Sequence, residues 1–122
     1  MYQSKYFCEG EFLRCEPPCD IEQMDVNFLK TLDRIRECAS IPLVLNCAYR
    51  SRQHDVKKGR SGNSAHTRGL AVDIRCTTSS NRMKIVRAAL ACGIRRIGIG
   101  RTFIHLDSDP SLPQDVIWDY YA

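Results

Sequence analysis

The chain has 122 residues, of which 43% are hydrophobic and 26% are charged. These proportions are typical of a globular protein and argue against a disordered or fibrous chain, and the length argues against a two-domain enzyme with a large cofactor. The formal net charge of +4 is mildly basic and does not by itself predict binding to nucleic acid. No apolar run reaches the about 20 residues that a membrane helix needs. We expect a single domain over residues 1–122, without a membrane partner.

The first residues lack the basic and then apolar pattern of a secretory signal, so synthesis in the cytoplasm is expected. The chain has seven cysteines, an odd number, and in that compartment reduced thiols are the default. Cys15 and Cys19 have a C-x3-C spacing, but no second pair is present to complete a four-ligand zinc site. The cysteines in apolar segments are expected to be small buried side chains; they are Cys38, Cys47, Cys76 and Cys92.

The first half of the chain predicts a helix and a strand after an irregular N-terminal segment, residues 1–19. From Asp20, a candidate N-cap, apolar residues recur at steps of three and four as far as Ala39, which predicts a helix. Residues 43–48 are predicted to form a buried strand. Residues 49–65 are polar and are predicted to form a long loop that carries several basic side chains, a charge suited to an anionic partner or simply to solvent.

The second half predicts further strands around one helix. Residues 70–75 alternate between apolar and polar side chains, the pattern of a half-buried strand. A helix is expected over 81–92, with Met83, Val86, Ala89 and Leu90 on its apolar face and Gly93 at its C-terminal end. Strands are expected over 94–99, 102–107 and 116–120. This order favours an α+β fold with helices on one face of a largely antiparallel sheet.

Two of these strands each have an apolar side and a side that carries ligand-type groups. Asp73 leaves its strand opposite Val72 and Ile74, and His105 and Asp107 leave theirs opposite Ile104 and Leu106. His66 lies just upstream of the first strand. Two imidazoles and a carboxylate are a common set of protein ligands for catalytic zinc, which leaves a fourth position for water. The alternatives are that the histidines are structural and that Asp73 pairs with Arg68 or Arg75.

The motif S-x-H-x-x-G-x-A-x-D over residues 64–73, followed by H-x-D over residues 105–107, resembles a known family. It is similar to the zinc peptidases of family M15, which include D-alanyl-D-alanine carboxypeptidases and phage endolysins and share a fold with the hedgehog signalling domain. Residues 48–51, A-Y-R-S, are similar to the family's G-Y-R-S segment, with Ala48 in place of glycine. The resemblance covers residues 5 to 120 and is that of a small phage-type member.

The resemblance implies roles for individual residues. His66, Asp73 and His105 would be the zinc ligands. Arg50 would bind the substrate and stabilise the oxyanion that develops on the scissile carbonyl. Ser64 would lie beside the site and bind the substrate or a ligand.

One position departs from the family pattern. Many members have an acidic general base three residues before the last histidine, and this chain has Thr102 there. Asp107 is the best replacement for that base. The alternative for Asp107 is a structural role in which it orients His105.

The activity that the resemblance implies is hydrolysis of amide bonds in peptidoglycan stem peptides, as a carboxypeptidase or an endolysin-type endopeptidase. A monomer is expected, which acts on the cell wall after phage-mediated release. The first alternative is a zinc-containing binding module on the same fold that has no catalytic activity. The second is a small basic nucleic-acid-binding domain, which would need aromatic side chains among the basic ones, where Tyr49 stands alone.

Overall fold

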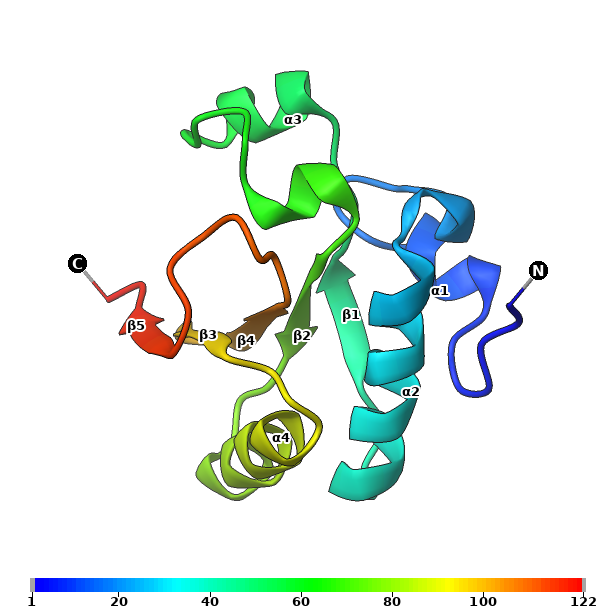
Figure 1. The fold of residues 1–122 in the computed structure, drawn as a ribbon, viewed down its shortest axis with the longest axis vertical. Helices are drawn as coiled ribbons and strands as arrows, with labels where there is room; N and C mark the ends of the chain where they lie inside the picture. The colour runs from blue at the N-terminus through cyan, green and yellow to red at the C-terminus, as the bar shows by residue number, and fades with distance from the viewer. Residues whose placement is uncertain (1, 122) are drawn as a thin grey trace.

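A five-stranded sheet lies at the centre of the structure, a computed structural model that describes residues 2–121 (Figure 1). The strands lie side by side in the order β1-β2-β4-β3-β5, and every neighbouring pair is antiparallel except β3 and β5. Their bounds are β1 Val44–Cys47, β2 Ala71–Arg75, β3 Arg96–Ile99, β4 Phe103–Asp107 and β5 Val116–Asp119. The predicted α+β class and the largely antiparallel sheet are confirmed.

Two longer helices pack against each other and cover one face of the sheet, as predicted (Figure 1). They are α2 Val26–Ala39 and α4 Ser79–Ala91. The shorter elements are α1 Glu9–Leu13, α3 Arg52–Lys57 and the 3₁₀ helices η1 Ile21–Gln23 and η2 Ala65–Arg68. Within residues 2–121, none of the helices has the length and apolar character to cross a lipid bilayer.

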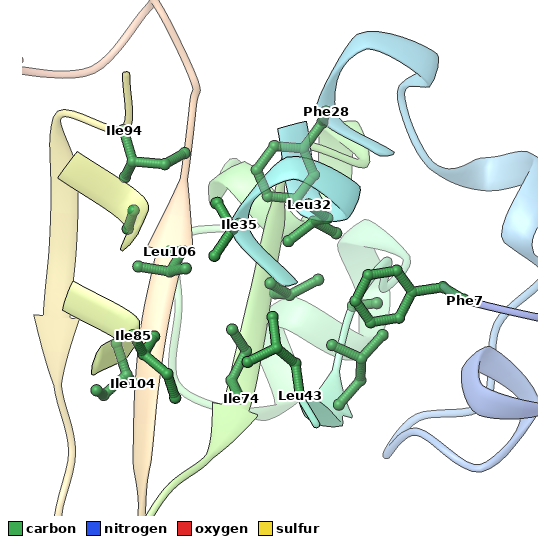
Figure 2. Packing of buried hydrophobic residues seen from close by; sticks show 14 of the residues in the cluster. Phe7, Phe28, Leu32, Ile35, Leu43, Ile74, Ile85, Ile94, Ile104 and Leu106 are labelled. Carbon is green, nitrogen blue, oxygen red and sulfur yellow. The ribbon is translucent and has the colours of Figure 1, made fainter. Parts of the chain in front are cut away.

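The core fills the space between these two helices and the sheet (Figure 2). Phe28, Leu32 and Ile35 of α2 and Ile85 of α4 point toward Ile74, Ile104 and Leu106 of the central strands. Because successive side chains of a strand point to opposite faces, the residues between these core positions lie on the other face. Asp73 and His105 are such residues.

The helix predicted from Asp20 to Ala39 is interrupted. Asp20 accepts a hydrogen bond from the Glu22 backbone N–H at 3.0 Å and caps η1, which ends before an extended Met24. Asp25 then caps α2 by accepting from the Phe28 backbone N–H at 2.9 Å. Two capping side chains therefore divide one apolar pattern into a short turn and a helix.

The segments predicted to lack regular structure, residues 1–19 and 49–65, contain short helices. Glu9–Leu13 forms α1, and Arg52–Lys57 forms α3 with Ser51 as its N-cap. Neither helix is long enough to show a clear apolar period, and α3 is almost entirely polar. The Ser51 side chain accepts from the His54 backbone N–H at 3.1 Å, and serine is a preferred N-cap residue. Ser51 is therefore the feature of the sequence that indicates the start of α3.

The buried face of α4 also differs from the prediction. The helix starts at Ser79, and its buried residues are Ile85, Ala88 and Ala89, whereas Met83 and Leu90 are 62% and 59% exposed. The buried face is thus shifted around the helix, because it is set by how α4 lies against α2 and the sheet.

The cysteines predicted to be buried do not all lie in the interior. Cys47 and Cys76 are buried, but Cys38 is exposed and Cys92 half-buried. Cys15 and Cys19, near the N-terminus, are buried as well. All seven cysteines are free in the structure.

Gly69 ends η2 in a left-handed conformation, and its substitution tests how tightly this turn packs. Its φ is +70°, and an added Cβ would lie 2.3 Å from the Gln23 carbonyl oxygen. We expect Gly69→Ala to lower the free energy of unfolding by at least about 2 kcal/mol, measured by urea denaturation. Gly59 is the control, because its φ is +82° but a Cβ there meets nothing within 4 Å. Gly59→Ala should cost only about 1 kcal/mol; equal losses would contradict the close packing at Gly69.

Candidate active site

The sheet register brings the two strand residues of the predicted zinc set together. Asp73 of β2 lies directly opposite His105 of β4, and His66 is held in η2, just before β2. The Asp73 Oδ1 atom lies 2.9 Å from His105 Nδ1 and 3.4 Å from His66 Nε2. The three residues that the sequence singled out therefore form one cluster on the sheet face opposite the core.

The remaining ring nitrogens of both histidines have partners of their own. His66 Nδ1 donates to the Ala48 carbonyl oxygen at 2.7 Å, and His105 Nε2 donates to Asp107 Oδ2 at 2.6 Å. In the neutral rings, His66 Nε2 and His105 Nδ1 are then lone-pair atoms that both face the Asp73 carboxylate. Three acceptors that converge in this way suit a cation. Two imidazole nitrogens and a carboxylate oxygen are donors that zinc commonly takes, and oriented imidazoles of this kind are typical of zinc sites.

Cys47 is a further metal-ligand type of side chain at this site. Leu45 is buried on the core face, and in a regular strand Cys47, two residues later, would point to that same face. A shift in register between Leu45 and Cys47 instead places Cys47 opposite Asp73. One ligand atom each from Cys47, His66 and Asp73 lies within 4.8 Å of the other two. Cys47 Sγ contacts His66 at Nδ1, 3.8 Å away, which is the nitrogen already bound to Ala48. Among residues 2–121, the set of Cys47, His66 and Asp73 is the one that meets that mutual spacing. His105 contacts Asp73 at 2.9 Å but is not part of that set.

The buried charges of the cluster stabilise one another. Burial raises the pKa of Asp73, but hydrogen bonds from His105 and His66 in their protonated forms outweigh burial, and the pKa lies well below its ordinary value. Burial lowers the pKa of His66, and its contacts with Asp73 and Cys47 reverse the shift, so that this pKa is raised. The pKa of His105 is raised in the same way, by Asp107 and Asp73 against burial. Without a metal, these shifts favour a charged Asp73 carboxylate and protons on the two imidazoles. A bound cation would take the place of the protons that face Asp73.

Arg50 is fixed beside the cluster by an acid that sequence reasoning missed. Its Nε donates to Asp55 Oδ1 at 2.6 Å and its Nη1 to Cys47 Sγ at 3.4 Å. Burial raises the pKa of Asp55, but hydrogen bonds from Ser64 and Arg50 lower it below the ordinary value. Ser64 Oγ donates to the same Asp55 oxygen at 2.6 Å. Ser64 therefore contacts Asp55, and this pair positions Arg50 at the pocket.

Asp107 is 1% exposed, and both of its oxygens have partners. Oδ2 accepts from His105, while Oδ1 accepts from Arg96 Nε at 2.7 Å and from the Asp109 backbone N–H at 3.2 Å. It contacts His105 at the ring nitrogen opposite the one that faces Asp73. This geometry favours the orienting role over that of a general base.

The cluster of His66, Asp73 and His105 opens into a pocket of about 330 Å³, with an aromatic wall on one side. Trp118 lies 5.5 Å from His105 between ring centroids, and Tyr120 lies 6.3 Å from Trp118 and 5.1 Å from Phe103. Gly98 makes room for this wall, because an added Cβ would lie 2.8 Å from both Trp118 and Tyr120. No motif in the sequence marked Trp118, Tyr120 or Gly98, since only the pairing of β3 with β5 brings them to the site.

The other candidates from the sequence lie apart from the cluster. His54, the third histidine of the chain, is in α3, where its Nε2 lies 3.9 Å from Glu16. Arg68 forms a 2.6 Å ion pair with Asp109 rather than with Asp73. Thr102 is exposed and precedes β4. Asp73 thus contacts the two histidines rather than an arginine.

Two histidines and an aspartate that converge in a pocket on an α+β sheet define a candidate metallohydrolase. A sequence model of the peptidase M15 family matches residues 8–107, and the chain belongs to this family.

The structure is similar to the crystal structure of the Serratia marcescens L-Ala D-Glu endopeptidase ChiX. The TM-score is 0.53 at 18% sequence identity, and the match covers 80% of this chain and 88% of that chain. At this identity, the similarity supports the fold, which is that of an M15 peptidase. A comparison with curated proteins gives no match.

Proposed function

We propose that the chain is a zinc peptidase that hydrolyses amide bonds in peptidoglycan stem peptides. The observation that carries the proposal is the convergence of His66 Nε2, His105 Nδ1 and Asp73 Oδ1, which would hold the zinc ion. When bound, zinc supplies a Lewis acid that activates water near neutral pH. The endopeptidase action named for the similar Serratia protein supports a peptide bond of the stem as the target.

The chain's own residues would bind and orient the peptide around this centre. Arg50 lines the pocket, and its ion pair with Asp55 fixes the direction of the guanidinium. Such a group stabilises the negative charge that develops on the scissile carbonyl oxygen, and it does so without reorganisation because it is already in place. Trp118 and Tyr120 provide an apolar surface along which a peptide can lie.

Asp107 is proposed to hold His105 in the ring orientation that directs Nδ1 toward Asp73. The chain is proposed to act as a monomer with one domain, on cell-wall material reached after phage-mediated release. The carboxypeptidase and endopeptidase forms of the activity remain alternatives within this proposal.

The direct test is digestion of purified peptidoglycan and of synthetic stem peptides, with the product masses read by mass spectrometry. We expect cleavage at one amide bond in the presence of zinc, no cleavage after chelation, and recovery when zinc is restored. The mass of the fragments identifies the bond. Asp73→Ala is the control, because it removes the carboxylate common to the cluster with His105 and the set with Cys47. Peptides that bind but stay intact with zinc present would contradict the peptidase and favour the binding module.

A further inference from the structure

Three arginines line the pocket, and they differ in what neutralises their charge. Arg50 pairs with Asp55 at 2.6 Å and Arg96 with Asp107 at 2.7 Å. Among residues 2–121, no carboxylate lies within ion-pair distance of Arg60. Arg60 is therefore the one of these three arginines whose charge is left for a ligand.

The backbone that carries Arg60 is anchored, although its side chain is exposed. The segment after α3 turns back on that helix, with the Arg60 backbone N–H donating to the Asp55 carbonyl oxygen at 3.1 Å. Gly62 N–H donates to the Asp55 side chain at 2.9 Å, and Asp55 is fully buried. The start of the Arg60 side chain is thus fixed by the same acid that holds Arg50.

The guanidinium of Arg60 lies over the ring of Tyr120, 5.4 Å from its centroid. Tyr120 belongs to the aromatic wall of the pocket, so this contact connects the segment after α3 to the end of β5. A cation–π contact of this kind uses no N–H hydrogen bond to a charged partner, so the N–H groups of the guanidinium stay available to donate. These N–H groups match the two oxygens of a carboxylate.

We propose that Arg60 binds a carboxylate of the substrate and makes the pocket selective for acidic peptides. This inference rests on the proposed function and adds a specificity-determining residue to it. A stem peptide offers this chemistry from two sources, the α-carboxylate of its γ-linked glutamate and its C-terminal carboxylate. Both are anions that an arginine at the pocket can bind.

The experiment compares three peptides on the zinc-loaded full chain: L-alanyl-γ-D-glutamyl-L-lysyl-D-alanyl-D-alanine, its glutamate α-carboxamide, and its C-terminal amide. Each is tested with the wild type, Arg60→Gln and Arg60→Lys. Arg101→Gln is the matched control, because the Arg101 guanidinium also lies over a tyrosine ring, 5.2 Å from the Tyr121 centroid, but Arg101 is not among the pocket residues. Cleavage gives KM and kcat. The fluorescence of Trp118, the single tryptophan, reports binding in the same pocket.

For the unmodified peptide, Arg60→Gln is expected to raise KM and weaken binding about tenfold, the scale of a charged hydrogen bond, with little change in kcat. Amidation of the carboxylate that Arg60 binds should remove the difference in KM between the wild type and Arg60→Gln. Amidation of the other carboxylate of the peptide should leave that difference unchanged. Arg60→Lys should restore part of the loss, and Arg101→Gln should behave as the wild type. The difference should shrink at high salt.

An equal loss on all three peptides, or no loss on any, would overturn the inference while leaving the peptidase proposal intact. If the wild type binds the peptides but cleaves none, the peptidase proposal fails, and the binding data alone decide the role of Arg60. A wild type that neither binds nor cleaves any of the three peptides would overturn both.

Discussion

His105→Ala is expected to abolish zinc binding, whereas Cys47→Ser is expected to leave one zinc ion per chain. His105 Nδ1 and His66 Nε2 face the same oxygen of Asp73, at 2.9 and 3.4 Å, so a cation placed among them meets three donors. Loss of an outer partner of a ligand weakens metal affinity by roughly 10- to 100-fold. Loss of a ligand itself should therefore weaken the zinc affinity by more than about 100-fold. Elemental analysis after dialysis gives the zinc content.

Cys47→Ser is the matched control because it keeps the shape of the side chain and removes the sulfur. The contact of Cys47 Sγ with His66 is at Nδ1, which already donates to Ala48, whereas His66 Nε2 faces Asp73. The prediction is therefore that Nε2 binds the metal together with Asp73 and His105, although Cys47 lies close enough to be the alternative ligand. Cobalt substitution gives an independent readout, since a sulfur ligand produces a charge-transfer band in the near ultraviolet. Such a band, or loss of zinc from Cys47→Ser, would assign the metal to Cys47, His66 and Asp73 instead.

Asp107→Asn is expected to weaken zinc affinity by about 10- to 100-fold and to lose activity that is largely recovered with excess zinc. The side chain is buried, and it holds His105 through Nε2 at a distance of 2.6 Å. The asparagine amide lacks the charge that favours the proton on that nitrogen, so the lone pair at Nδ1 is less firmly defined. Zinc occupancy and turnover measured on the same sample separate the two effects.

A different result would restore the catalytic role of Asp107. Full zinc occupancy with turnover lower by roughly 100- to 10,000-fold is the effect of losing a general base. Near-normal activity without added zinc would argue against both roles. It would direct attention to Asp119, an exposed acid that lines the pocket, rather than to Asp109, which is buried and paired with Arg68.

The sequence predicted the central cluster because two strands carry it. Alternation along residues 70–75 and 102–107 places Asp73 and His105 on the face opposite the core, and the register of β2 with β4 confirms that they lie opposite each other. Local signals of this kind are reliable because the apolar side of each strand must be buried. The polar side chains must then point to the opposite face of the sheet.

The supporting residues were outside the reach of such patterns. Asp55 lies in a polar segment that was predicted to be a loop, and only the folded turn around it shows that it holds Arg50 and Ser64. Cys47 reaches the site through a register shift in β1, and Trp118 reaches it through the parallel pairing of β5 with β3. The contacts of Asp55, Cys47 and Trp118 depend on a folded turn, on an irregular strand register, or on the pairing of strands that are distant in sequence. A repeating pattern within one element does not indicate any of these features.

The sequence by itself therefore determined the fold class, the presence of two longer helices over one face of the sheet, and the sheet face that carries Asp73 and His105, because each follows from a repeating pattern of burial within one element. The assignment of His66, Asp73 and His105 as metal ligands came from the family motif and stays a prediction. Only the tertiary structure decided which groups surround that cluster. The partner of Arg50, the orientation of His105 by Asp107, and the place of Arg60 over Tyr120 depend on distances between elements. Polar side chains can pair with many alternatives in the unfolded chain, and packing of the elements against one another selects one partner for each.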